Sequence, residues 1–246
     1  MIDGPELFCR YAQAPNLLGY CGPDNDEGVT AVAAGLTMPV EEMTRIGMAF
    51  QGAWPYLELI SKLSGHHPLD HEVVEAYWLG SPLLDQLDFV KWGSSAADRF
   101  HGRAGPRWAP LADALNSGGV PNHAFHVFCA YPWVGLLGEG FAGPSLEVLD
   151  RCRIGWGVVT DTDDQMAIVR RRPLVWVEDV LRLGDPVVEP FRAPGKLAPG
   201  DHVSLHWDFV CQRLDRRRLA RLRAVHDRHL AIANAELTAH RLEPSH

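Results

Sequence analysis

The sequence predicts an α+β protein in two parts: a mostly helical domain over residues 1–145, and a small β-barrel over residues 146–246 that ends in a helix. In the first part, apolar residues recur every three or four positions, which is typical of amphipathic helices. In the second, short runs rich in Val, Ile and Trp alternate with turn residues, as in small barrels. The net charge is −9 over residues 1–145 and +1 over the rest, which also favours two units with different surfaces.

The composition is that of a folded protein with a real core. The chain has 246 residues, of which 46% are hydrophobic and 22% are charged, and this balance argues against disorder. A net charge of −8 argues against general binding of nucleic acid. We find neither a signal-peptide pattern nor 18 consecutive apolar residues, so we expect a cytoplasmic protein that does not bind in a membrane.

The first part divides into a loop-rich start and a series of short helices. Residues 1–28 are rich in Pro, Gly, Asn and Asp, and we interpret them as a loop or cap. Residues 29–118 have helical spacing, and four prolines divide them: Pro39, Pro55, Pro68 and Pro82. The NSGGVPN stretch at 116–122 is a predicted loop.

The segment from residue 123 to residue 137 is apolar and aromatic, and its pattern fits either a buried strand or a helix. It contains His123, His126 and Cys129 at a spacing of three. On a helix the three side chains would share one face, as metal ligands must, and a zinc or iron site would be attractive. On a strand His126 would oppose the other two, and a structural role is the competing interpretation.

The second part begins after a candidate linker, GEGFAGPS, at 138–145. Strand-like runs then occupy residues 153–162, 165–177, 185–191 and 201–210. A helix is predicted over residues 214–237, because Asp215 can cap it and Leu219, Leu222, Val225 and Ile232 fall on one face.

Two stretches of this part resemble the HypC/HupF-type chaperones of [NiFe]-hydrogenase maturation. They are CRIGWGVV at 152–159 and GDHVSLHWDFVCQRLD at 200–215, and the resemblance covers residues 150–235. It implies an OB-like barrel and a metal-carrying chaperone. The sequence departs from the family in that Cys152 is internal and Asp208 replaces a glycine. The whole chain is also similar to an actinobacterial family of unknown activity that is associated with hydrogenase gene clusters.

The resemblance implies that Cys152 and His206 bind an iron atom that carries cyanide and carbon monoxide. A thiolate and a neutral imidazole suit such iron, and the first and closing strands of a small barrel can lie side by side. Asp208 has the strand parity of His206, so it could orient the imidazole. A lone cysteine or histidine is otherwise more often a packed core residue, and that interpretation stays open.

Partner contacts and other chemistry are less clearly indicated. Arg216, Arg217 and Arg218 form either a solvated basic face or a docking patch for a partner, which the resemblance implies is the hydrogenase large subunit or another maturation protein. Nucleophilic catalysis by Cys21 is conceivable, although nothing in the sequence pairs it with a base.

Three functions therefore remain open. The leading hypothesis is an accessory factor that binds or hands over the iron fragment. The alternatives are a metal-dependent enzyme of the same pathway, which a metal held by His123, His126 and Cys129 would favour, and a structural adaptor without metal. The sequence contains no Walker loop, G-x-S-x-G, H-E-x-x-H, Rossmann glycine triplet or C-x-x-C, which argues against nucleotide-driven chemistry and the common hydrolases.

Overall fold

The computed structural model of the protein describes residues 2–24, 26–88, 90–94, 96, 108–131, 133–137, 142–163, 165–193 and 195–242. It confirms the predicted α+β class, with helices first, a small barrel next and a long helix last. Residues 138–141 of the candidate linker lie outside the described residues.

Short helices make up the first part of the chain, as the three-to-four spacing predicts. Pro55 lies in the first turn of its helix and Pro82 begins another, both positions where a missing N–H costs little. The helices are α1 (Gly4–Leu17), α2 (Glu27–Ala33), α3 (Val40–Ala49), α4 (Trp54–Ser64), α5 (His71–Leu79), α6 (Pro82–Asp85) and α8 (Trp108–Asn116).

Helix α1 overturns the prediction of a loop over residues 1–28. Asp3 caps its start, since its carboxylate accepts a hydrogen bond from the N–H of Glu6 at 2.8 Å, and a proline occupies the first turn. The helix buries Leu7, Phe8 and Tyr11 completely. It also tolerates an internal proline, Pro15, because tertiary packing outweighs the lost hydrogen bond.

The segment that fitted either a strand or a helix is helical. It comprises α9 (His123–Phe125), the π-helix η2 (His126–Ala130) and α10 (Trp133–Leu136). Helix α11 (Ala142–Cys152) then runs across the predicted domain boundary at 145/146, and the first barrel strand begins only at Gly155.

Five strands close into a barrel in the order β1-β2-β5-β7-β6. All neighbours are antiparallel except β5 and β7, which are parallel, and this is the arrangement expected of an OB-like barrel. The two remaining strands, β3 and β4, form a separate hairpin inserted between β2 and β5. The strands are β1 (Gly155–Thr162), β2 (Met166–Arg171), β3 (Leu174–Val177), β4 (Val180–Leu183), β5 (Val187–Arg192), β6 (His202–His206) and β7 (Phe209–Arg213).

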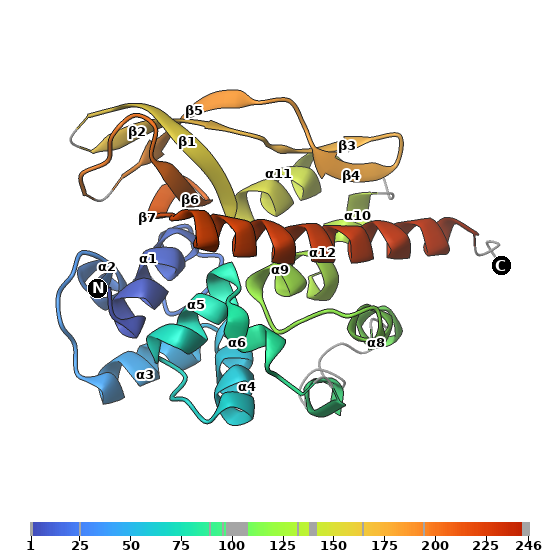
Figure 1. Ribbon diagram of the computed structural model, residues 1–246, viewed down its shortest axis with the longest axis horizontal. Coiled ribbons are helices and arrows are strands. Elements are labelled where there is room, and N and C mark those ends of the chain that lie inside the picture. Colours follow the sequence, from blue (N-terminus) through green and yellow to red (C-terminus); the bar gives the residue numbers. More distant parts are fainter. Residues whose placement is uncertain are drawn as a thin grey trace.

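The C-terminal helix α12 (Arg216–Leu242) runs between the barrel and the N-terminal helices (Figure 1). Asp215 caps it as predicted, accepting a hydrogen bond from the N–H of Arg218 at 2.8 Å. Leu219 and Leu222 share one core with the N-terminal helices, whereas the barrel has a core of its own that includes Val169 and Phe191. The two parts therefore pack as one body, with α12 as the shared element.

Among the described residues, no helix combines the length and the apolar character needed to cross a membrane.

Candidate metal centre

Three side chains that are distant in the sequence converge where the helical part meets the barrel. They are His123, Cys152 and His206, and one potential ligand atom from each lies within 4.8 Å of the other two. Bonds of about 2.0–2.3 Å to a metal would require these ligand atoms to move slightly closer together. We call this group the ligand trio.

The strand register explains why Cys152 and His206 meet. Strand β1 pairs antiparallel with β6, and Gly155 lies opposite Leu205. Cys152, which precedes β1 by a few positions, is therefore brought to the end of β6, whose last residue is His206. Cys152 itself is the last residue of α11. The structure brings these two residues together, but the imidazole of His206 is buried.

A proline in α1 determines which nitrogen of His206 is free. Pro15 has no N–H, so the carbonyl of Tyr11, four residues earlier, loses its helical partner. That carbonyl accepts a hydrogen bond from Nδ1 of His206 at 2.6 Å. Because a carbonyl only accepts, Nδ1 carries the proton and Nε2 keeps a lone pair. This Nε2 is buried and has no hydrogen-bond partner among the described residues, so it is the best prepared ligand atom of the trio.

His123 is held more tightly than His206. Asn122 caps α9 and donates two hydrogen bonds to the carbonyls of Ala76 and Tyr77 at the end of α5. Nε2 of His123 donates to the carbonyl of Cys152 at 2.8 Å, which leaves Nδ1 to accept from the hydroxyl of Tyr77 at 3.1 Å. His123 can bind a metal only after one of these bonds is given up, so it ranks below Cys152 and His206.

The trio lines a cavity of about 110 Å³ that is walled largely by aromatic side chains, with room for a metal and several water-sized ligands. Its lining also includes Cys21 and His126. Beside it, the half-exposed ring of Tyr20 stacks on Trp207, with centroids 4.4 Å apart. This stacked pair forms part of the rim between the cavity and solvent.

Burial keeps the donor groups of the cavity uncharged. It lowers the pKa of His206 to about 3, and His123 adds to the shift, while the carbonyls of Tyr11 and Cys152 oppose it. Burial likewise lowers the pKa of His123 to about 4 and that of His126 to about 3. It raises the pKa of the Cys152 thiol to about 12, and Cys21 adds to that shift. The imidazoles are thus ready to bind, whereas the thiol must lose a proton.

Of the three residues that the sequence places at a spacing of three, the structure brings two together in the cavity. His123 and His126 both line the cavity, but Cys129 does not and instead packs among the surrounding helices. Three residues fall short of one α-helical turn, and the wider π-helix that starts at His126 increases the deviation. The expectation of one shared face for all three is therefore wrong for Cys129.

Asp208 does not orient His206. The chain leaves β6 at His206 and turns, with Trp207 in a left-handed conformation at φ 53°, so the strand parity assumed for Asp208 ends there. Its side chain is exposed and lies 3.8 Å from Nη1 of Arg151. The carbonyl of Tyr11 holds the imidazole instead.

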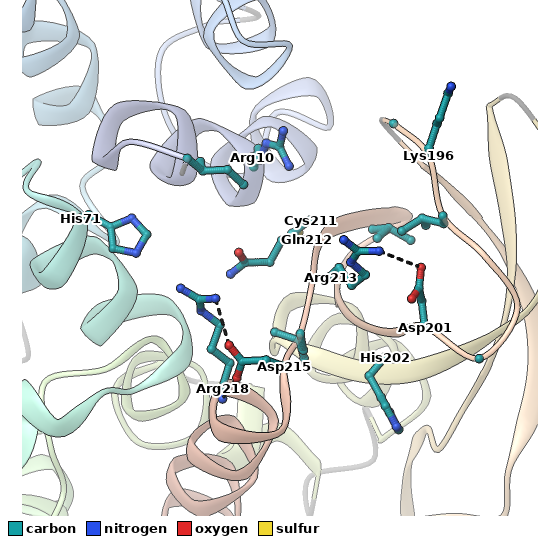
Figure 2. A pocket seen from close by; sticks show the side chains of 16 residues that line it. Arg10, His71, Lys196, Asp201, His202, Cys211, Gln212, Arg213, Asp215 and Arg218 are labelled. Carbon is teal, nitrogen blue, oxygen red and sulfur yellow. Dashed lines mark hydrogen bonds and ion pairs between the residues drawn. The ribbon is translucent and has the colours of Figure 1, made fainter.

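The three arginines at the start of α12 have different environments. Arg216 and Arg217 are exposed. Arg218 is partly buried, and its guanidinium contacts Glu75 at 2.6 Å and Asp215 at 3.1 Å. Arg218 lines a groove of about 690 Å³ together with His71 and Gln212, and Figure 2 shows these three side chains. Arg218 thus joins α12 to α5, and a docking role remains a prediction for Arg216 and Arg217.

Two features of the site escaped the sequence analysis. The sequence placed Cys21 in a turn without a partner, yet the fold brings it into the cavity of the trio. The composition around Pro15 predicts a loop, although a proline within an apolar helical pattern signals a carbonyl that is free to bind elsewhere. Together, a thiol and buried neutral imidazoles in an apolar cavity suit a soft or borderline metal such as iron or zinc.

Comparison with known proteins gives a family but no activity. No curated protein and no solved structure matches this chain. A family model described as "Family of unknown function (DUF6390)" matches residues 1–240. The chain belongs to this family.

Proposed function

We propose that this protein is an accessory factor of [NiFe]-hydrogenase maturation that carries the iron fragment bearing cyanide and carbon monoxide. The fragment is its cargo, and Cys152 and His206 are the residues that bind it. The observation that carries the proposal is the convergence of the ligand trio in one apolar cavity. The likeness of residues 150–235 to HypC/HupF-type chaperones supports the choice of cargo.

The donor set suits this cargo chemically. Iron with cyanide and carbonyl ligands is low-spin and favours a strong thiolate donor, which Cys152 supplies after it loses its proton. Nε2 of His206 offers a lone pair whose direction is fixed by the bond from Nδ1 to Tyr11. The aromatic walls, which include Tyr77, Trp78 and Trp207, give the small diatomic ligands a largely apolar surface.

The partner in this proposal is the hydrogenase large subunit or another maturation protein, and the place of action is the cytoplasm. The exposed Arg216 and Arg217 form the proposed docking patch, and the next residue in the chain, Arg218, lines the groove (Figure 2). They sit at the start of α12, the helix that joins the barrel to the helical part.

Infrared spectroscopy on the anaerobically purified protein tests the proposal. The protein is produced together with the maturation proteins, and its metal content and the cyanide and carbonyl stretching bands are recorded. We expect iron and diatomic bands in the wild type and loss of both in Cys152→Ala. Cys129→Ala is the matched control, because this thiol does not line the cavity, and it should keep the bands.

Two other outcomes would replace the proposal. Metal without diatomic bands would support a metal-dependent enzyme of the same pathway, which the additional donors Cys21 and His126 in the cavity favour. A protein that contains no metal under any of these conditions would be a structural adaptor.

A further inference from the structure

The cavity contains a second thiol and imidazole that the ligand trio does not use. Cys21 and His126 both line it, yet their donor atoms are not part of the cluster within 4.8 Å. Both residues are partly exposed, as is Cys152 of the trio, whereas His123 and His206 are buried. They therefore lie beside the trio in the same cavity.

Gly52 shows how close the two donor atoms are to each other. A Cβ atom at this position would lie 3.0 Å from Nε2 of His126 and 3.6 Å from Sγ of Cys21. The two atoms thus flank one small space, and the absence of a side chain at Gly52 keeps that space open.

The loop that carries Cys21 is held over the cavity. The buried Asn16 donates hydrogen bonds to the carbonyls of Cys21 and Pro23, and it accepts one from the N–H of Asp26. The neighbour of Cys21, Tyr20, stacks on Trp207, which directly follows His206. Cys21 is therefore fixed next to the rim, between solvent and the trio.

We propose that Cys21 and His126 form a transfer pair, which binds an incoming thiophilic metal first and passes it to Cys152, His123 and His206. This inference rests on the proposed metal binding by the trio. It gives the helical part of the chain, which supplies both residues, a direct role in loading the barrel site.

The physical reason is the cost of losing ligands. An incoming iron fragment or metal ion must give up its exchangeable ligands to enter a cavity walled by aromatic rings, and a donor pair at the rim replaces them stepwise. The thiol of Cys21 releases its proton when it binds the metal. It regains a proton when the metal moves to Cys152, whose thiol releases its own. One proton is therefore released overall for each metal bound.

Stopped-flow loading with cobalt(II) alone tests the transfer pair. Thiolate-to-cobalt absorption reports both the rate of loading and the final complex. Gly52→Ala inserts a methyl group between the two donor atoms without removing either, and Gly52 has no left-handed backbone conformation that would forbid alanine. We expect Gly52→Ala and Cys21→Ser to load severalfold more slowly than the wild type but to reach the same final absorption per protein.

Two matched controls should load at the wild-type rate. They are Gly93→Ala, whose added Cβ meets no atom of the described residues within 4 Å, and Cys129→Ser, which removes a thiol outside the cavity. Unchanged loading rates in both Gly52→Ala and Cys21→Ser overturn the transfer pair while the trio continues to bind. Loss of final absorption in Cys21→Ser also overturns it, because Cys21 would then be a permanent ligand. Failure of the wild type itself to bind cobalt would also overturn the transfer pair as a site for thiophilic metal ions, whereas the infrared experiment tests the proposed function separately.

Discussion

Nδ1 of His206 donates a hydrogen bond to the backbone carbonyl of Tyr11, 195 residues earlier in the chain, at 2.6 Å. This bond joins the end of β6 to α1 and fixes the tautomer of the imidazole. It exists because Pro15 cannot donate to the same carbonyl. The internal proline of α1 thus prepares Nε2 of His206 for a metal.

Restoring the missing N–H should weaken metal binding. In Pro15→Ala the new N–H competes for the Tyr11 carbonyl, so the imidazole loses its fixed orientation. We expect the affinity for cobalt(II) to fall about tenfold. This is the low end of the loss in metal affinity that follows when a metal-binding histidine loses the hydrogen-bond partner of its other nitrogen. Isothermal titration measures the affinity, and ¹⁵N shifts of His206 report the tautomer. Pro5→Ala is the control, since Pro5 lies in the first helical turn and costs α1 no hydrogen bond. Equal affinities in both variants would contradict the role of Pro15.

Metal affinity should rise with pH by about tenfold per unit between pH 6 and 8. Burial lowers the pKa of His206 to about 3 and that of His123 to about 4, so neither carries a proton to release in this range. It raises the pKa of Cys152 to about 12, so this thiol must release one proton for each metal bound. Competition titrations at several pH values measure the slope. A slope of two protons would mean that a second thiol remains bound.

The metal-free protein should lose stability as the pH falls below about 6.5, the ordinary pKa of histidine. Burial lowers the pKa of five histidines to between about 3 and 4; they are His123, His126, His206, His226 and His229. Between these values and 6.5 the unfolded chain binds protons that the folded chain does not, so acid favours unfolding. Urea unfolding at pH 7, 6 and 5 gives the free energy of unfolding. A value that stays constant over this range would show that these imidazoles are protonated in the folded state.

Removing the charge of Asp150 should destabilise the protein by about 3–5 kcal/mol, as expected when a buried ion pair loses one partner. The carboxylate contacts Arg153 at 3.0 Å and Arg171 at 2.7 Å, and it accepts the N–H of Leu174. Burial alone would raise the pKa of Asp150, but the two arginines outweigh this effect and lower it. Asp150→Asn leaves the buried guanidinium of Arg153 without its ion-pair partner, whereas Arg171 keeps Glu189 at 2.7 Å.

The matched control for Asp150→Asn is an exposed ion pair. Asp85 contacts Arg221 at 2.6 Å on the surface, so Asp85→Asn should cost less than about 1 kcal/mol. Urea unfolding of the two variants at pH 7 compares them directly. Similar losses would mean that the Asp150 network contributes no more than a surface pair.

The sequence by itself determined the elements whose signal is local. Three-to-four spacing predicted the short helices and α12, and alternating Val-rich runs predicted the barrel strands. The same local logic failed for α1, where Pro, Gly and Asn suggested a loop, because burial of Leu7, Phe8 and Tyr11 stabilises the helix only in the folded protein.

Only the tertiary structure decided which donors share the site. The β1–β6 register brings Cys152 to His206, and the packing of α9 against α5 adds His123. Cys21 enters the same cavity on a loop held by Asn16, whereas Cys129, at the predicted spacing, turns away. Spacing along a chain fixes neighbours within one helix or strand, but a metal site needs atoms within a few ångströms in space. Long-range packing sets those distances, and it also determined that Nε2 is the free nitrogen of His206.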